Sequence, residues 1–265
     1  MKIAVIGLGA IGTSVLDLLR SETRLQVGWV LVSQVTPQRL ELVQRLAPQA
    51  QLLTALPAQA KPDLLVECAA HAALAQHVAP VLARGIPALV TSVGALSEPG
   101  MAEQLEAAAL AGCTQLQLLP GAMGGIDALA AARIGGLEAV SYTGRKPPQA
   151  WTGTPAEQLC NLQSLSEAFC IFDGSAREAA QRYPRNANVA ATLSIAGLGL
   201  DRTRVQLWAD PAVTENVHQV QASGSFGQME LTLRGKPLAA NPKTSALTVF
   251  SVVRAVLNKA APLSI

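Results

Sequence analysis

The chain has 265 residues, of which 50% are hydrophobic and 14% charged, and its formal net charge is +2. This composition excludes a disordered chain, and the small net charge gives no electrostatic reason to expect a nucleic acid or an anionic membrane as partner. No apolar run is long and uninterrupted enough to predict a membrane span. We therefore expect a cytoplasmic protein without membrane or nucleic-acid partners, folded as one large domain or two smaller ones.

The cysteine pattern predicts neither disulfides nor a metal site. No C-x-x-C pair occurs, and the scattered cysteines form no set of ligands typical of a metal site. We expect buried free thiols in a reducing cytoplasm. The four cysteines are Cys68, Cys113, Cys160 and Cys170.

The first element combines a strand with a glycine pattern. Residues 3–6 form an apolar run typical of a buried parallel strand, and G-x-G-x-x-G follows directly. Apolar residues then recur at helical spacing, which places the glycines between a strand and a helix. In that position the glycines allow a tight turn, close approach of a pyrophosphate and close helix packing. We expect a dinucleotide to bind at Gly7, Gly9, Ala10, Ile11 and Gly12.

A secretory signal is the alternative interpretation of this N-terminal stretch, because a basic residue precedes apolar ones. Three glycines interrupt the apolar run, Asp17 and Arg20 follow it, and no clear small-residue cleavage site is present. These features favour the nucleotide-binding interpretation.

The second strand, predicted at residues 25–32, bears on the choice of cofactor. An acidic residue that binds the ribose normally stands at its end, but here the chain has Ser33 and Gln34. A 2′-phosphate would meet no negative charge there, so both NAD and NADP remain open as cofactors. Ser33 is a candidate ribose-side contact, and the alternative is that both residues are ordinary turn residues.

Strands and helices continue to alternate as far as residue 119, which predicts a doubly wound parallel sheet of the Rossmann type. The loop at residues 68–71 follows a strand at the edge where such sheets bind ligands, so it is a candidate nicotinamide contact. His71 also fits the start of a helix. We predict helices at 37–46, 72–83 and 101–111, and strands at 52–56, 62–68, 86–91 and 116–119.

A segment of small residues at 120–127 predicts either a crossover between domains or a backbone that approaches a flat ring. The closely spaced strands beyond it indicate an α+β domain with a mixed or antiparallel sheet. We expect a dinucleotide-binding domain of residues 1–120 with a C-terminal segment, 241–265, and a catalytic and dimerisation domain of residues 121–240. The second domain has predicted strands at 137–143, 204–208, 215–222 and 227–233, and helices at 175–181 and from 187.

The last predicted helix covers residues 246–257, with residues 241–245 as its cap. Four side chains at helical spacing give it an apolar stripe. They are Leu247, Phe250, Val253 and Leu257.

His218 is the leading candidate for chemistry. On a strand it shares a face with Val220 and Ala222, which predicts partial desolvation, a pKa near neutrality and suitability for general acid and base work. A buried structural histidine is the alternative. Asn188, at the start of a small-residue helix, is either a helix cap or a carboxamide that contacts a ligand. No motif indicates a hydrolase or a phosphoryl-transfer enzyme.

Eight segments, in order and over nearly the whole chain, together resemble the L-aspartate dehydrogenase family. The glycine motif is common to many families, whereas the segments at 184–191 and 215–220 are far more specific. The eight are GLGAIG (7–12), VECAAH (66–71), TSVGAL (91–96), LPGAMGGIDAL (119–129), YTGRKPP (142–148), FDGSAREAAQRYPRNANVAATLSIAGLG (172–199), ENVHQV (215–220) and NPKTS (241–245).

The resemblance implies oxidative deamination of L-aspartate, through iminoaspartate, to oxaloacetate and ammonia, with NAD or NADP as cofactor and a possible link to NAD biosynthesis. It also implies that Ala122 and Asn188 contact the cofactor and that His218 is the active-site histidine. We expect a homodimer with a small-molecule substrate.

A substrate with two carboxylates also needs cations, and we expect Arg145, Lys146 and Lys243 to supply them from loops. Two alternatives remain open. A homoserine dehydrogenase or dihydrodipicolinate reductase relative would share the first domain, although the chain lacks the His-His-x-x-x-Lys segment typical of the latter. A nucleotide sensor without catalysis would bind NAD(H) and turn over no amino acid.

Overall fold

The computed structural model describes residues 1–184, 188–238 and 241–264. The chain divides into two compact units, each with its own core. Met1–Gly121 with Thr248–Ile265 forms the first unit, and Ala122–Leu247 forms the second.

The first unit is built on a six-stranded sheet in which every pairing is parallel. The strand order is β3-β2-β1-β4-β5-β6, so the order reverses beside β1. The central strands are apolar on both faces because helices cover both faces. The strands are β1 (Lys2–Ile6), β2 (Gln26–Leu31), β3 (Gln51–Leu53), β4 (Leu64–Glu67), β5 (Ala88–Val90) and β6 (Leu116–Leu118).

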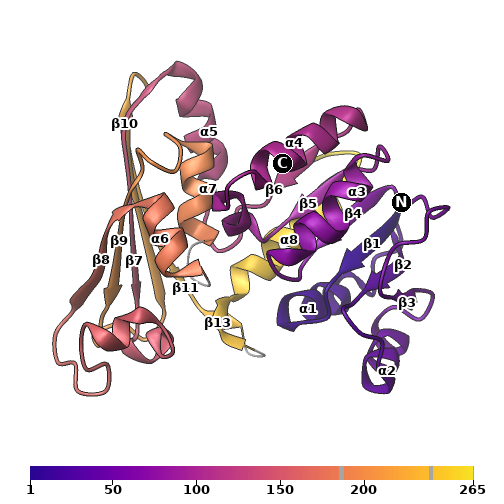
Figure 1. Ribbon diagram of the computed structural model, residues 1–265, viewed down its shortest axis with the longest axis horizontal. Helices are drawn as coiled ribbons and strands as arrows, with labels where there is room; N and C mark the ends of the chain where they lie inside the picture. The colour runs from indigo at the N-terminus through magenta and orange to yellow at the C-terminus, as the bar shows by residue number, and fades with distance from the viewer. Residues whose placement is uncertain (185–187, 239–240, 265) are drawn as a thin grey trace. The chain divides into compact units, whose positions relative to one another are not determined.

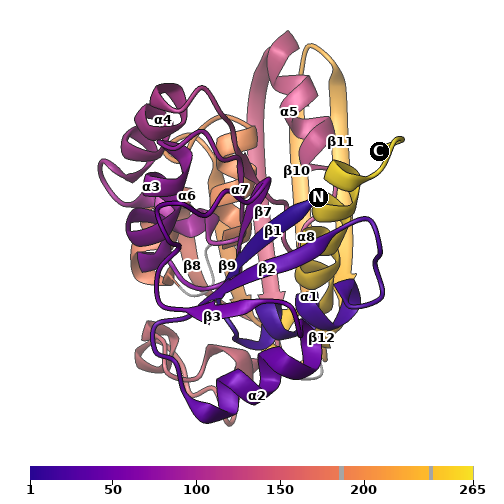
Figure 2. The same ribbon diagram turned by 90° about the vertical axis from the view of Figure 1, so that its right-hand side faces the viewer.

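Helices lie on both faces of this sheet. Helices α1 and α2 lie on one face and α3 and α4 on the other (Figures 1 and 2). This is the predicted doubly wound arrangement. The helices are α1 (Ala10–Leu19), α2 (Pro37–Leu46), α3 (Ala79–Leu82), which follows a π-helical turn at Leu74–Val78, and α4 (Met101–Ala111).

The second unit is built on a mixed five-stranded sheet of order β11-β10-β7-β9-β8. The β7 and β9 strands are parallel, and the other neighbours are antiparallel. This confirms the predicted mixed sheet. The strands are β7 (Leu137–Lys146), β8 (Phe169–Ser175), β9 (Arg204–Ala209), β10 (Asn216–Gly224) and β11 (Gly227–Gly235).

One face of the second sheet carries three helices, α5 (Ile126–Gly135), α6 (Ala176–Arg182) and α7 (Asn188–Ala196) (Figure 1). The core between them includes Tyr142, Trp151 and Val220. Ser175 and Glu178 start α6 with a reciprocal capping box, which satisfies two N–H groups at the helix start. Figure 1 shows these three helices of the unit on the same face of the sheet.

Two elements differ from the sequence prediction. Helix α5 was not predicted; its first two residues fall in the segment 120–127, interpreted as a crossover or as a backbone that approaches a flat ring, and Gly125 caps the helix with φ of 73°. Asn241–Ser245 is the strand β13, which pairs with β12 (Pro237–Leu238), and only its last residue acts as the predicted cap: the Ser245 hydroxyl oxygen accepts a hydrogen bond from the Leu247 N–H at 3.3 Å. The last helix, α8 (Ala246–Ala260), begins after it.

The buried face of α8 is not the predicted stripe. Val249, Val252 and Val256 are buried, whereas Phe250 is 53% exposed. The helix is apolar on two sides, so spacing alone does not identify the side that faces the core.

The cysteines are free, but only Cys68 is buried, and Cys113 is exposed on the surface, which corrects the expectation of four buried thiols. Within the described ranges, no helix is both long enough and apolar enough to cross a membrane.

Candidate active site

The three glycines after β1 serve three different purposes. Gly7 has φ of 97°, and a Cβ there would lie 2.6 Å from the carbonyl oxygen of Cys68, so backbone geometry and space both require glycine. A Cβ at Gly12 would collide with the carbonyl of Gly7, so the third glycine lets α1 pack against the turn. These two positions are explained by the fold alone.

Gly9 is different, because nothing in the described protein requires a glycine there. Its φ of −75° suits any residue, and a Cβ would have no atom within 4 Å. Gly9 is also the N-cap of α1, and no side chain caps that helix end. Its free N–H groups and its dipole favour an anion. The open space at Gly9 therefore fits the pyrophosphate of a dinucleotide, and Ala10 and Ile11 open the helix beside it.

Ser33 lies exposed just beyond the end of β2, where the ribose of a bound dinucleotide is expected. The neighbouring Gln34 accepts a hydrogen bond through its carbonyl oxygen from Nη1 of Arg39 at 2.6 Å. An arginine therefore stands near this strand end, and no carboxylate occupies positions 33 and 34.

A buried carboxylate, Glu67, holds the same edge of the sheet together. It is fully buried at the end of β4, and Oε1 accepts hydrogen bonds from the Ala69 N–H at 2.7 Å and the Ser92 hydroxyl at 2.8 Å. Its Oε2 accepts from the N–H groups of Thr91 and Ser92. The carboxylate thus fixes the loops after β4 and β5 beside the glycine turn. The sequence predicts that a strand ends near Glu67, but it does not predict the hydrogen bonds that Glu67 accepts.

The loop at residues 68–71 lies at this edge, as predicted for the end of β4. Burial raises the pKa of the Cys68 thiol well above its usual value, so it stays protonated. His71 lies at the start of the next helical segment, with Nδ1 3.6 Å from Oε1 of Glu98. These contacts are all within the chain, so the predicted contact of the loop with a nicotinamide stays a prediction.

His218 lies in the middle of a buried polar contact in the second unit. It is 3% exposed on β10, and its Nδ1 lies 2.9 Å from the hydroxyl oxygen of Tyr142 on β7. The two rings are nearly parallel, 17° apart, with centroids 6.0 Å apart. Its other ring nitrogen, Nε2, is buried and has no hydrogen-bond partner among the residues that the structure describes.

The pKa of His218 is not near neutrality as predicted. Burial, with a smaller contribution from the positive charge of Lys146, lowers it to about 4. Strand alternation identified the face correctly, but the depth of burial depends on the helices that cover that face. The imidazole is therefore neutral throughout the physiological range.

Lys146 lies in β7 and not in a loop as predicted, because the strand continues to the residue before Pro147. It is on the same face as Tyr142, and its Nζ lies 5.3 Å from the centre of the Trp151 ring. Burial lowers its pKa to about 8, so the ammonium is still largely protonated at pH 7.

Arg145 also lies in β7 and not in a loop, and strand alternation places it on the opposite face from His218. It forms an ion pair with Asp210 at 3.3 Å and lies over the Trp208 ring at 4.6 Å. The placement favours Lys146 over Arg145 as the cation near His218.

Three other candidates belong to the second unit. Ala122 is its first residue and packs against the core, and Asn188 is the first residue of α7, where its carbonyl oxygen accepts a hydrogen bond from the Thr192 hydroxyl at 2.8 Å. Lys243 lies in the strand β13 and not in a loop, and its side chain is outside what the structure describes. The predicted helix start at Ala187 is also outside the described residues.

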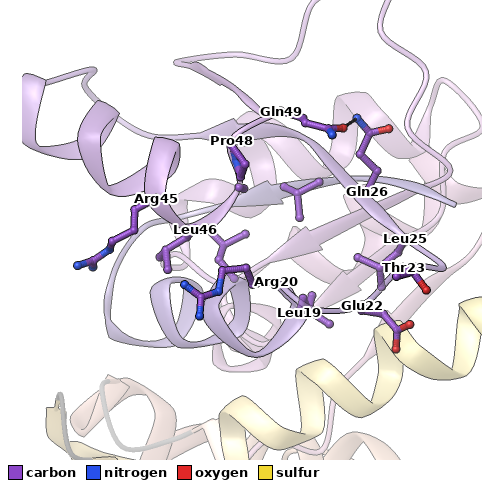
Figure 3. A pocket seen from close by; sticks show the side chains of 13 residues that line it. Leu19, Arg20, Glu22, Thr23, Leu25, Gln26, Arg45, Leu46, Pro48 and Gln49 are labelled. Carbon is purple, nitrogen blue, oxygen red and sulfur yellow. Dashed lines mark hydrogen bonds between the residues drawn. The ribbon is translucent and has the colours of Figure 1, made fainter.

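A cavity of about 430 Å³ lies beside the amino end of β2, at the opposite end of the strands from the glycine turn (Figure 3). It is bounded by the end of α1, the start of β2 and the end of α2, with Arg20 and Arg45 at its margin. The glycine turn lies at the carboxyl ends of the strands, where ligands bind in such sheets, so this cavity is not the cofactor site.

No group of three or more histidine, cysteine, aspartate or glutamate side chains gathers closely enough to hold a metal ion in the described ranges. The candidate residues thus form two separate groups, the glycine turn in the first unit and the Tyr142–His218–Lys146 cluster in the second.

Comparisons with known proteins match two different family models to the two parts of the chain. Residues 7–118 match the model of the NAD-binding domain of homoserine dehydrogenase, and residues 127–259 match that of the C-terminal domain of aspartate dehydrogenase. The crystal structure of aspartate dehydrogenase from Thermotoga maritima is similar in fold, with a TM-score of 0.79 at 23% identity; the match covers 100% of this chain and 99% of that one.

Two relatives are much more similar in sequence. An L-aspartate dehydrogenase from Polaromonas is 65% identical, with 98% of this chain and 97% of the relative covered. One from Pseudomonas aeruginosa is 64% identical, with both chains fully covered. With its C-terminal half matched by the family model and its whole length matched by these relatives, the chain belongs to the L-aspartate dehydrogenase family.

Proposed function

We propose that this protein catalyses the NAD(P)-dependent oxidative deamination of L-aspartate. L-Aspartate and NAD(P)⁺ give iminoaspartate, NAD(P)H and a proton, and water then converts iminoaspartate to oxaloacetate and ammonia. The observation that carries the proposal is the identity of 65% and 64%, over almost the full length, to proteins named L-aspartate dehydrogenase.

The glycine turn supports the cofactor part of this proposal. NAD(P)⁺, when bound there, would supply the acceptor for the hydride that leaves the substrate Cα. The chain's contribution is binding: the uncapped N-terminus of α1 takes the pyrophosphate where Gly9 leaves space, and Ser33 faces the ribose. Ala122 and Asn188 are proposed as further cofactor contacts on the strength of the family resemblance.

The cluster on the second sheet supports the substrate part. His218 offers a neutral buried imidazole whose Nε2 has no partner in the described chain, and Lys146 offers an ammonium on the same face. An amino dicarboxylate presents anionic oxygens that suit both groups. We therefore assign His218 to the reacting end of the substrate and Lys146 to a carboxylate, with Lys243 and Arg145 as weaker candidates for the other carboxylate.

We also infer a cytoplasmic homodimer whose product feeds NAD biosynthesis. The second sheet supports the dimer, because in the described part of the chain its helices cover one face only. On the other face the Trp208 indole N–H is buried, with no acceptor within the described ranges. Light scattering during size-exclusion chromatography tests this: a mass near 55 kDa, about twice the 27.5 kDa of one chain, is expected, and a mass of one chain contradicts it.

The test of the activity is a screen of L-amino acids with NAD⁺ and NADP⁺ at alkaline pH, followed by absorbance of the reduced cofactor. We expect L-aspartate to be oxidised far faster than L-glutamate or L-homoserine. Preferential oxidation of L-homoserine would contradict the proposal and favour the related dehydrogenase. Tight NADH binding with no turnover of any amino acid would favour a nucleotide sensor.

A further inference from the structure

The hydroxyl of Tyr142 has a single hydrogen-bond partner among the described residues, and that partner is His218. The oxygen lies 2.9 Å from Nδ1, and Tyr142 is 2% exposed. Burial raises the pKa of Tyr142 well above its usual value, so the phenol keeps its hydrogen at every physiological pH. This hydrogen needs an acceptor, because a buried donor without one is costly.

Two neutral tautomers of His218 are possible, and they leave different numbers of groups without a partner. If Tyr142 donates to Nδ1, the imidazole proton is on Nε2, and the Nε2–H is the one group without a partner. If Nδ1–H donates to the phenol oxygen, both the Tyr142 hydrogen and the Nε2 lone pair lack partners. The first arrangement therefore satisfies more of the buried groups.

The strand beside His218 provides the space for this contact. Gly144 lies opposite His218 in the register of β7 and β10. A Cβ at Gly144 would lie 2.7 Å from the Tyr142 hydroxyl oxygen and 3.1 Å from the carbon that bears it. Glycine weakens a strand interior and often marks a close approach of other groups. Here the missing side chain lets the phenol reach the imidazole.

We propose that Tyr142 is a positioning residue: its hydroxyl donates to Nδ1 of His218, keeps the imidazole proton on Nε2, and so makes Nε2–H a hydrogen-bond donor to an oxygen of the substrate. His218 thus donates a hydrogen bond and does not begin the reaction as a base. The identity of the substrate rests on the proposed function, whereas the tautomer does not.

The first test needs no variant. Long-range proton–nitrogen NMR spectra of the protein with ¹⁵N-labelled histidine distinguish the two tautomers. The chain has three histidines, so His71→Gln and His77→Gln assign the signals of the third. We expect unprotonated Nδ1 and protonated Nε2 in His218, unchanged from about pH 6 to pH 9. A protonated Nδ1 in this range would overturn the proposal.

Two variants then test the cause. Tyr142→Phe removes the donor, and Gly144→Ala pushes the hydroxyl away while the tyrosine stays. In both we expect a mixture of tautomers or a proton on Nδ1. Tyr183→Phe is the matched control, because Tyr183 is the other tyrosine of the chain and its buried hydroxyl donates to the Ile171 carbonyl at 3.2 Å. His218 signals that stay the same in Tyr142→Phe would overturn the proposal.

Kinetics provide the functional readout. We expect Tyr142→Phe to lower kcat with L-aspartate roughly tenfold with unchanged NADH affinity, and Tyr183→Phe to change kcat less than about twofold. Equal losses in the two variants would indicate a merely structural hydroxyl and contradict the positioning role. If the native protein does not oxidise L-aspartate, the proposed function fails, but the NMR result still decides the tautomer.

Discussion

The glycine turn of the first unit and the His218 cluster of the second differ in the groups that they offer to a ligand. The turn uses backbone: an uncapped helix end and the space that Gly9 leaves open. The cluster uses side chains held at depth, with Tyr142 against one nitrogen of His218 and the other nitrogen without a partner in the described chain. The proposed function thus assigns cofactor affinity and chemistry to separate groups, which mutations can separate.

The largest expected effect is that of His218→Ala. The variant loses the donor that we assign to the substrate, so turnover of L-aspartate should fall by roughly two to three orders of magnitude. NADH affinity should barely change, because the phosphates are assigned to the glycine turn. Stopped-flow turnover, NADH fluorescence titration and a thermal melt on the same protein check this. Near-normal turnover with a large loss of stability would show that His218 is structural.

Substitutions in the glycine turn should give the converse result. Gly9→Val should fold normally, because no protein atom lies within 4 Å of a Cβ at this position, yet weaken NADH binding by roughly two orders of magnitude. Gly12→Val is the matched comparison, and it should lower the melting temperature because its side chain meets the Gly7 carbonyl. A Gly9→Val protein that binds NADH normally would show that the phosphates lie elsewhere.

The pKa of Lys146 gives a pH dependence with a defined sign. The ammonium is charged below pH 8 and becomes neutral above it, so its attraction for a carboxylate is present at low pH and lost at high pH. Above pH 8 the KM for L-aspartate should rise by about tenfold per pH unit. Lys146→Met should have a higher KM with no such rise. If the KM of Lys146→Met rises with pH in the same way, the pH dependence belongs to another group.

The smallest expected effect concerns Ser33. Without a carboxylate at positions 33 and 34, we expect the protein to use both NAD and NADP. Ser33→Asp should weaken NADP binding about tenfold through repulsion of the 2′-phosphate and leave NAD binding nearly unchanged. Ser33→Asn, which adds similar bulk without charge, is the control. Absolute specificity of the unmodified protein for NAD would contradict the expectation.

The sequence predicts the first unit well because its signals are local. A buried strand, three glycines and a helical pattern lie within twenty residues, and α2 and α4 match their predicted bounds, 37–46 and 101–111. The family resemblance, carried by longer segments, also led to the correct family. In contrast, helix α5 and the strand conformation of β13 were not predicted, because small residues and an N-P-K-T-S segment fit several local structures equally well; only the cap at Ser245 was as expected.

The sequence predicts less about the His218 cluster, because its properties depend on contacts between distant residues. Tyr142 and His218 are 76 positions apart and meet only through the register of β7 and β10. Strand alternation identifies the face of His218, but the shift of its pKa to about 4 depends on the helices that cover that face. The bonds of Glu67 to residues 24 and 25 positions away are likewise not visible in the sequence.

The most direct test of the separation between cofactor binding and chemistry is a titration of L-aspartate turnover with NAD⁺ in two variants, Gly9→Ala and His218→Ala. We predict that a high NAD⁺ concentration restores Gly9→Ala to nearly the native kcat, because this variant is limited by cofactor binding. In His218→Ala the half-saturating NAD⁺ concentration should be native, and kcat should stay roughly two to three orders of magnitude lower at every concentration. Recovery of His218→Ala at high NAD⁺, or a low kcat of Gly9→Ala at saturation, would contradict the account.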